Sequence, residues 1–303
     1  MFYLPYKIEE DIYRIVEGGF VKDITTMRDC KSKAYSDDVL EVVKKLRPID
    51  DACFEVIADD IAFCQEMLRI ILSDGKLIVK DVVVQKSIKN IYGRSVRLDA
   101  LCTLGNDKKC NIEVQRADND DHLRRVRFNA SSIVVKDSEV KQRFSEIEDI
   151  IVVYISEFDI FGDGFVLYHI NNVVQETNKK VDDGLTRIFV NTEIKDGFII
   201  SEYMTQFKQT EISGQHFPEL KRRMEYAKNS RGGLGIMCDA INELAMKRIE
   251  AVRDEIEEKA RKEGELQGCI KNIKAMYAAG IDTFKIASIV NIPLEEVEKI
   301  LAN

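Results

Sequence analysis

Apolar positions along the chain follow two periods, and the shorter period of about two residues marks six stretches as β-strands. The predicted strands cover residues 77–85, 95–104, 109–115, 149–158, 165–174 and 186–191. The stretch at 149–158 contains the longest apolar run, IIVVYI, which is typical of a buried strand. The first three strands follow one another with short connections.

A longer, helical period precedes and follows these strands. The predicted helices cover residues 38–46, 48–72, 120–135, 200–207, 218–227 and 236–262, and the segment from Glu265 onward predicts three short helices. Pro48 and Asp50 suit the start of the second helix, and Ser73-Asp74-Gly75 ends it. The sequence NSRGG interrupts the helical pattern before residue 236.

The order of these elements predicts the fold class. Consecutive strands with short connections pair antiparallel, and the helical crossover between Gln115 and Ile151 allows a parallel neighbour. We therefore expect an α/β fold, with a mixed sheet flanked by helices and an α-helical C-terminal extension. The expected parts are an N-terminal extension at 1–47, a main domain at 48–230, a long amphipathic helix at 231–264 and a small helical tail at 265–303.

The long amphipathic helix suits two arrangements. Its apolar positions include Ile241, Leu244, Ile249, Val252 and Ile256. Their spacing is compatible with a short coiled coil, through which the C-terminal helices would form a homo-oligomer. The small number of heptads favours a helix that lies on its own domain.

The hairpin around Gly105-Asn106-Asp107 carries Asp99 in one strand and Glu113 in the other, although strands usually exclude acidic residues. A three-residue loop, with Gly or Asn in the left-handed conformation, pairs Leu104 with Lys108. Counting back from that pair places Asp99 opposite Glu113. A two-residue loop would put the carboxylates on different faces, so the proposed site depends on the register.

Strand alternation sorts the neighbouring side chains. Gln115 projects on the same side as Glu113. In the first strand of the hairpin, one face is expected to hold Arg97, Asp99, Leu101 and Thr103. The other face is expected to hold Val96, Leu98, Ala100 and Cys102.

Two carboxylates held together repel each other, which raises the pKa of one of them unless a cation lies between them. Mg²⁺ suits such a pair because it prefers oxygen ligands and often takes only one or two carboxylates; Mn²⁺ is the alternative ion. The backbone carbonyl of Val114 would add a ligand, and Gln115 would orient a water molecule. The competing interpretation of Asp99 and Glu113 is a polar hairpin face that is open to water.

Several segments together resemble one known family, the PD-(D/E)XK nuclease family transposases, also called recombination-promoting nucleases. The similar segments are SIKNIYGRSVRLDALC, NIEVQRADNDDHLRRVRFNAS and RIFVNTEI, and the resemblance extends from about residue 48 to residue 240. Within them, Asp99 and the run Glu113-Val114-Gln115 match the motif. Leu98 stands where the motif has proline, and Gln115 stands where it has lysine.

The resemblance implies a restriction-endonuclease-like fold and metal-dependent hydrolysis of phosphodiester bonds in DNA. It implies that residues 48–230 form the nuclease-like domain. It also implies that Asp99 and Glu113 bind Mg²⁺ and that Gln115 occupies the position of the catalytic lysine. Because Gln115 cannot supply a positive charge, the resemblance predicts binding at this site more strongly than turnover.

Other charged residues are candidates for supporting this site. The resemblance suggests Glu66 of the first helix as an additional acid and Arg125 as the arginine near the site, although a solvated helix residue is the favoured interpretation of Glu66. Arg124 and Arg127 share a helical face, where they suit either contact with phosphate or pairing with acidic neighbours. For His122, a surface or cap role is favoured over catalysis, because the sequence identifies no partner.

The tail GIDTFKIASIVNIPLEEVEKILAN resembles a helix-turn-helix pattern. Its expected small core comprises Ile286, Ala287, Ile289, Ile292, Val297 and Leu301. The second helix carries Glu295, Glu296 and Glu298, which would repel DNA phosphates. This charge favours a structural or protein-contact role for the tail.

The composition limits the remaining function classes. A net charge of −8 argues against a general nucleic-acid binder, so DNA contact requires a local basic surface. The sequence predicts no signal peptide and no membrane helix, and seven cysteines without a CxxC pair predict reduced thiols in a cytoplasmic protein. The leading hypothesis is a Mg²⁺-dependent DNA endonuclease. The alternatives are a non-catalytic interaction protein on a nuclease scaffold and a DNA-binding regulator that uses the tail.

Overall fold

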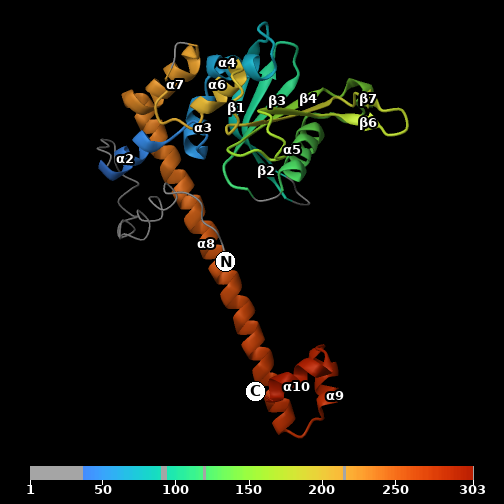
Figure 1. The fold of residues 1–303 in the computed structure, drawn as a ribbon. Coiled ribbons are helices and arrows are strands. Elements are labelled where there is room, and N and C mark those ends of the chain that lie inside the picture. The colour runs from blue at the N-terminus through green and yellow to red at the C-terminus, as the bar shows by residue number, and fades with distance from the viewer. Residues whose placement is uncertain (1–36, 90–93, 119–120, 214–215, 303) are drawn as a thin grey trace. The chain divides into compact units, whose positions relative to one another are not determined.

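The structure, a computed structural model, describes residues 37–89, 94–118, 121–213 and 216–302. The chain divides into two compact units, residues 1–243 and residues 244–303. The first unit contains a mixed sheet with helices against it, and the second is helical (Figure 1). Residues 1–36 of the predicted N-terminal extension at 1–47 lie outside the described residues.

A six-stranded sheet forms the centre of the first unit, in the order β1-β2-β3-β4-β8-β5. Its strands are β1 (Val79–Ile88), β2 (Val96–Leu104), β3 (Lys109–Gln115), β4 (Ile150–Ser156), β8 (Leu185–Asn191) and β5 (Leu167–Ile170). The pairs β3–β4 and β4–β8 are parallel, and the other pairs are antiparallel. The predicted mixed sheet is therefore confirmed. The stretch predicted as one strand at 165–174 is divided between β5 and β6 (Asn172–Val174), and β6 pairs with β7 (Lys179–Val181) in a separate ribbon.

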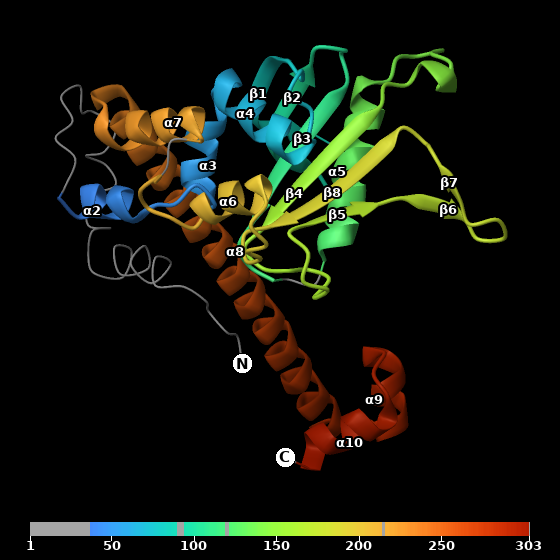
Figure 2. The same cartoon turned by 45° about the horizontal axis from the view of Figure 1, so that its top comes forward.

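Helices cover both faces of the sheet, as the element order predicts. One face is covered by α5 (His122–Asp137), and the other by α3 (Asp51–Ala58) and α4 (Ile61–Ile71) (Figure 2). Around α3 and α4 lie α2 (Asp37–Lys45), α6 (Ile199–Gln206) and α7 (Pro218–Asn229). A short 3-10 turn, Phe144–Glu146, precedes β4.

The prediction of one continuous helix at 48–72 is wrong, because the chain bends between α3 and α4. Asp60 adopts an extended conformation, and its side chain accepts a hydrogen bond of 2.9 Å from the backbone N–H of Phe63. This N-cap starts a new helix in the middle of an apolar pattern that suits either one helix or two. The helical period alone does not detect the bend.

The boundary predicted at residue 48 is also too late. The described residues 37–47 belong to the first unit, because Val42, Val43 and Leu46 are buried. The ammonium of Lys228 in α7 donates a hydrogen bond of 2.9 Å to the carbonyl of Lys44. The helix α2 is therefore a packed element of this unit rather than part of an extension.

The longest helix, α8, runs from Arg231 to Ala278, beyond the predicted end at residue 262 and the predicted part boundary at 264. The interruption predicted at NSRGG is limited to Ser230, whose side chain accepts a hydrogen bond of 2.9 Å from the N–H of Gly233. A Cβ atom on Gly233 would lie 2.0 Å from the carbonyl oxygen of Tyr226. The glycine therefore permits α8 to start directly against the end of α7.

The second unit consists of the rest of α8, α9 (Thr283–Val290) and α10 (Leu294–Ala302). Its core forms around Ile273, Ile286 and Val297. Ile289 was predicted in this core, but its side chain is 60% exposed. Of the three short helices predicted after Glu265, the first is the C-terminal part of α8.

Two predictions about the whole chain concern its cysteines and membrane segments. The described cysteines, Cys53, Cys64, Cys102, Cys110, Cys238 and Cys269, are free thiols, as predicted. Among the described residues, no helix has both the length and the apolar character that crossing a membrane requires.

The close approach at Gly233 generates a stability prediction. Gly233→Ala is expected to lower the free energy of unfolding by about 2 kcal/mol, because the added methyl group forces backbone atoms of α7 and α8 apart. Gly232→Ala is the matched control, since its Cβ would meet only the hydroxyl end of Tyr226, at 3.2 Å. Urea unfolding followed by circular dichroism measures both. Equal unfolding midpoints for the two variants would contradict this account of the helix start.

Candidate functional site

The β2–β3 hairpin has the predicted register. Cα partners run from Ala100 with Ile112 to Thr103 with Lys109, and the N–H of Leu104 donates to the carbonyl of Lys108 at 2.9 Å. The left-handed residue of the three-residue loop is Asp107, with φ of 65°, rather than the expected glycine or asparagine. Asp and Asn tolerate this conformation for the same reason, a short polar side chain. The same register continued by one pair brings Asp99 opposite Glu113.

At that next pair the regular backbone ladder stops. The β2–β3 register ends at Ala100 and Ile112, and the β1–β2 pairing omits Gln85 and Asp99, where Gln85 has φ of 51°. Side chains replace the missing backbone contacts. The carboxylate of Asp99 accepts the N–H of Val114 at 3.0 Å, and the carboxylate of Glu113 accepts the N–H of Asp99.

This irregularity also reverses the alternation of side chains in β2. Val96 and Leu98 pack with Leu101 in the apolar cluster beneath α5. By contrast, Cys102 forms a hydrogen bond with Cys64 of α4, on the opposite side of the sheet. The prediction that Val96, Leu98, Ala100 and Cys102 share one face is therefore wrong. Regular alternation fails because the strand is irregular at Asp99.

Glu113 lies in a buried polar environment. Its side chain is 4% exposed and accepts a hydrogen bond of 2.8 Å from the amide of Asn111 and another from Asn129 of α5. Burial raises the pKa of Glu113 to about 7, although these hydrogen bonds and the charge of Arg125 oppose the rise. Burial also raises the pKa of Asp99, and repulsion by Glu113 adds to that increase. Without a cation, the pair therefore retains a proton near neutral pH.

Gln115 is held at both ends of its amide group. Its nitrogen donates to the carbonyl of Ala117 at 2.7 Å, and its oxygen accepts from Arg125 at 2.6 Å. Of the three arginines considered in α5, Arg125 is the one turned toward the sheet, whereas Arg124 and Arg127 are exposed. The positive charge of Arg125 therefore lies where it acts on both Asp99 and Glu113.

A comparison with known families agrees with this geometry. The sequence model of the PD-(D/E)XK nuclease family transposases matches residues 62–199, which include β2, β3 and α5. The match covers 138 of the 303 residues of the chain. No curated protein and no solved structure matches the chain.

The family match supports part of what the resemblance implied. The mixed sheet and its flanking helices are consistent with the restriction-endonuclease-like fold of PD-(D/E)XK proteins. PD-(D/E)XK nucleases generally use divalent metal ions, and the family implies DNA as the substrate class. The match begins in α4 and ends at the first residue of α6, so α2, α3, α7 and the C-terminal helices lie outside it.

A network of two arginines and two carboxylates connects the end of β3 with the start of α3. Arg116 contacts Asp50 at 3.0 Å and Glu157 at 3.3 Å. Arg47 contacts the same two carboxylates at 3.0 and 2.7 Å. Because Glu157 follows β4 and Asp50 precedes α3, the network fixes the first turn of α3 near the ends of two central strands.

The first turn of α3 contains an acid that sequence reasoning missed. After burial and the charge of Glu113, the negative charge of Asp51 also raises the pKa of Asp99. The sequence signal for Asp51 is its place at the helix start marked by Pro48 and Asp50. The single helix predicted at 48–72 gave that start no role in the site. Among the described residues, no three His, Cys, Asp or Glu side chains are placed to hold a metal ion together.

Glu66, the acid suggested for this role, is placed elsewhere. Its two carboxylate oxygens accept the N–H groups of Glu219 and Leu220, each at 3.0 Å. The N–H groups in the first turn of α7 have no partner within the helix. Glu66 therefore caps that helix and stabilises its positive end. The structure gives Glu66 a capping role and offers no support for a metal-binding one.

His122 is buried and has two partners, which corrects the expected surface or cap role. One ring nitrogen lies 2.9 Å from the hydroxyl of Tyr154, and the other lies 3.0 Å from a carboxylate oxygen of Asp118. Tyr154 is the Cα partner of Glu113 in the parallel β3–β4 pair. His122 therefore fixes the tyrosine that stands beside the carboxylate pair.

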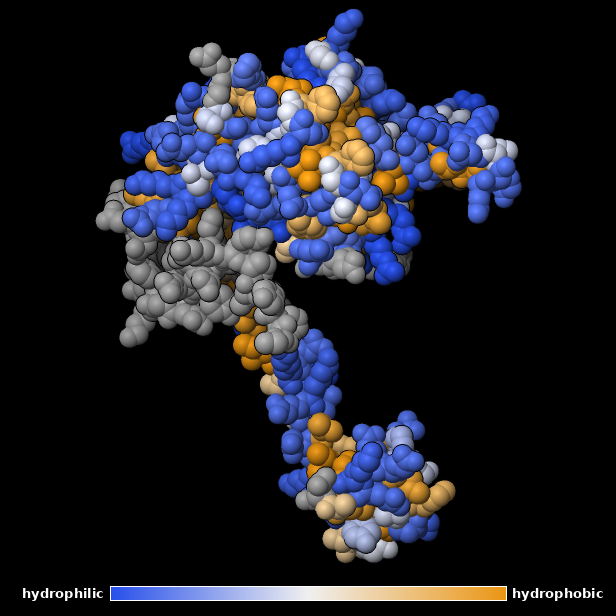
Figure 3. Space-filling view, viewed as in Figure 1, coloured by the Kyte–Doolittle hydropathy of each residue, from blue (hydrophilic) through white to orange (hydrophobic). Residues whose placement is uncertain are grey.

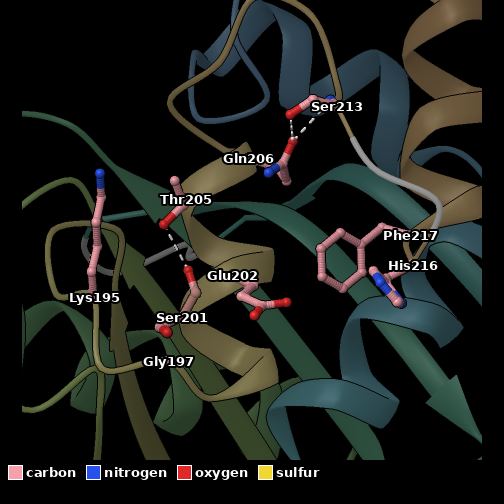
Figure 4. A pocket seen from close by; sticks show the side chains of 9 residues that line it. All are labelled: Lys195, Gly197, Ser201, Glu202, Thr205, Gln206, Ser213, His216 and Phe217. Carbon is pink, nitrogen blue, oxygen red and sulfur yellow. Dashed lines mark hydrogen bonds between the residues drawn. The ribbon is translucent and has the colours of Figure 1, made fainter.

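A separate surface pocket of about 340 Å³ lies around α6 and does not include the predicted site residues. Figure 4 shows Glu202 and Gln206 of α6 at this pocket, with Lys195, His216 and Phe217 on other segments. The hydroxyl of Thr205 donates to the carbonyl of Ser201. The pocket has no convergent set of acids, and the carboxylate pair remains the better candidate site.

The pKa of Glu113 predicts how stability depends on pH in metal-free protein. Folding raises this pKa from 4.5 to about 7, so the folded state binds the proton more tightly. The contribution of this proton to the free energy of unfolding is fully present below the lower pKa. The contribution falls by roughly 3 kcal/mol as pH rises through the higher pKa. Urea unfolding in EDTA between about pH 4 and about pH 8 measures this loss.

Glu113→Gln should remove most of that dependence, and the exposed Glu139→Gln should retain it. The comparison isolates the buried carboxylate from the general effect of removing one acid. The same pH slope in all three proteins would show that Glu113 is not protonated on folding.

Proposed function

We propose that the domain is a Mg²⁺-dependent DNA endonuclease, with Mn²⁺ as the alternative ion, and that Asp99 and Glu113 bind the metal. The supporting observation is the interrupted ladder, where these two carboxylates replace a backbone pair and face each other across neighbouring strands. Glu113 is buried and Asp99 is partly buried, and two acids with raised pKa values repel each other and would stabilise a divalent cation between them. The family match supplies the reaction class.

The donor atoms fit a hard cation. Carboxylate oxygens from Asp99 and Glu113, with the carbonyl of Val114, provide the oxygen ligands that Mg²⁺ prefers, and water and substrate phosphate complete its shell. When bound, the ion supplies Lewis-acid charge for the hydrolysis of a phosphodiester bond. Asp51 contributes further negative charge near Asp99 and would hold a water molecule of the shell.

The remaining residues orient and balance the site. One lone pair of the Gln115 oxygen accepts from Arg125, which leaves the other to accept from a water molecule. The motif lysine would contribute a positive charge at this position, and Arg125 supplies a charge in contact with Gln115. Arg125 therefore acts as a positioning residue through Gln115, while the exposed Arg124 and Arg127 are available for contacts with DNA phosphates.

Other parts of the chain fit this proposal. The nuclease-like domain extends from the described start of α2 to the first turns of α8, since α2, α3 and α7 pack with the matched segment. The free thiols suit a reducing, cytoplasmic location. The exposed glutamates of α10 oppose DNA binding by the tail, which disfavours a regulator that uses it.

The second candidate function is non-catalytic interaction on a nuclease scaffold. The observation that favours it is the amide of Gln115, which is bound at both ends and carries no charge. Calorimetry with Mg²⁺ or Mn²⁺ in the presence of DNA separates the two functions. Binding of neither ion would favour the scaffold.

The first activity prediction concerns Asp99. Asp99→Asn should lower Mg²⁺-dependent plasmid nicking by at least about 100-fold, because the amide keeps the hydrogen bond from Val114 but loses the ligand charge. Asp107→Asn is the matched control, since Asp107 lies in the hairpin loop and pairs with Lys80 at 2.7 Å. Equal nicking by wild type and Asp99→Asn would reject the site.

The second activity prediction separates Arg125 from its neighbours. Arg125→Gln should lower the nicking rate about 10- to 100-fold at saturating DNA, because Gln115 loses its partner and the site loses a positive charge. Arg124→Gln should instead weaken DNA binding with little change in the saturated rate. The measurements are kcat and KM for plasmid nicking. A similar effect of both substitutions on KM alone would contradict the positioning role.

A further inference from the structure

The part of α8 in the second unit carries an unpaired apolar stripe. Val252 is 41% exposed, Ile256 is 61% exposed and Leu266 is 56% exposed, and Ile270 is partly exposed. They are four, ten and four residues apart, and because ten is a sum of steps of three and four residues, all four lie along one side of the helix. Of the apolar positions expected to lie on the chain's own domain, Ile241 is buried, and Leu244 and Ile249 are partly buried, whereas Val252 and Ile256 are exposed.

Two charged residues lie in the middle of the same stripe. Continuing the three-and-four spacing from Ile256 reaches Lys259 and then Glu263, followed by Leu266. Both charged residues are exposed. Figure 3 shows hydrophobic surface at two places along α8 with hydrophilic surface between them. The stripe thus consists of two apolar segments on either side of one positive and one negative position.

We propose that this stripe binds a second copy of the chain as an antiparallel coiled coil. In the proposed register, Val252 meets Ile270 of the second copy and Ile256 meets Leu266 of the second copy. At the centre, Lys259 meets Glu263 of the second copy, and the twofold axis repeats each contact. Every apolar position then faces an apolar position, and each charge faces its opposite. The proposal is independent of the nuclease function proposed above.

Charge complementarity selects the antiparallel orientation. In a parallel pair in register, Lys259 would face Lys259 and Glu263 would face Glu263, which places like charges in two core layers. Moving the antiparallel pair by one heptad would place Val252 against Glu263 and Ile256 against Lys259. A buried charge without an opposite partner is unfavourable, so the pattern favours one register.

The surroundings of the stripe suit a solvated two-helix contact. Away from it, the helix carries ion pairs between Arg261 and Glu265, at 2.8 Å, and between Lys262 and Glu258, at 2.7 Å. These pairs stabilise the helix and keep its other faces in water. Beyond Ile270, the next apolar position is Ile273, which α9 and α10 already bury. The contact is therefore limited to Val252–Ile270.

Charge reversal tests the proposal in the full-length chain. Sedimentation velocity over a concentration series should show a dimer for wild type and an increase of at least about tenfold in the dimer dissociation constant for Lys259→Glu. The double variant Lys259→Glu/Glu263→Lys should restore dimerisation, because each reversed charge again meets its opposite. Lys271→Glu is the matched control, since it makes the same charge change on an exposed position outside the stripe.

Cysteine cross-linking tests the orientation. In chains that also carry Cys269→Ser, which removes the native thiol beside Ile270, a mixture of Val252→Cys and Ile270→Cys chains should form cross-linked dimers under mild oxidation, whereas Val252→Cys alone should form fewer. Cross-linking of Val252→Cys with itself would show a parallel pair and overturn the proposal. A monomeric wild type, or a double variant that remains as weak as Lys259→Glu with unchanged helicity by circular dichroism, would overturn it as well.

Discussion

The missing backbone pair at Asp99 is the constraint on which the proposed site depends. A regular hairpin would bond Asp99 and its opposite residue through their backbones, and both carboxylates would point away as ordinary side chains. Here the β1–β2 ladder omits Asp99. The carboxylate of Asp99 accepts the N–H of Val114, and the carboxylate of Glu113 accepts the N–H of Asp99, in place of the missing contacts. The strands separate locally but remain connected. Two acids are thereby held at one point of a rigid sheet.

The rest of the domain balances the electrostatic cost of that arrangement. Burial and repulsion between Asp99 and Glu113 favour a shared proton or a cation. Arg125, which belongs to α5, offsets part of their negative charge. On the other side, the arginine and carboxylate network fixes the start of α3. A site built in this way is preorganised, because the groups that hold the acids belong to regular elements. The proposed metal binding rests on these electrostatics, independently of turnover.

The second unit has a small core of its own and an exposed apolar stripe. Its small core around Ile273 covers only the end of α8, so the apolar positions from Val252 to Ile270 find no partner in that core. A single helix with an apolar stripe gains stability when a second surface removes the stripe from water. In the proposed pair, the charges at Lys259 and Glu263 select the antiparallel orientation and add to the affinity. Partner choice in this region is thus encoded separately from the nuclease-like site.

The sequence by itself determined the antiparallel pairing of the first three strands, the presence of a mixed sheet and the hairpin register, because connection lengths and loop length are local properties. The place of β8 between β4 and β5 was decided by the tertiary structure. It also brought Asp99, Glu113 and Gln115 together, since all three follow from that register. Only the tertiary structure decided the bend at Asp60, the capping role of Glu66 and the position of Asp51. It also revealed the reversed alternation in β2. Apart from the local N-cap between Asp60 and Phe63, these features depend on contacts between segments far apart in the chain, and a local pattern contains no information about which partner a side chain finds.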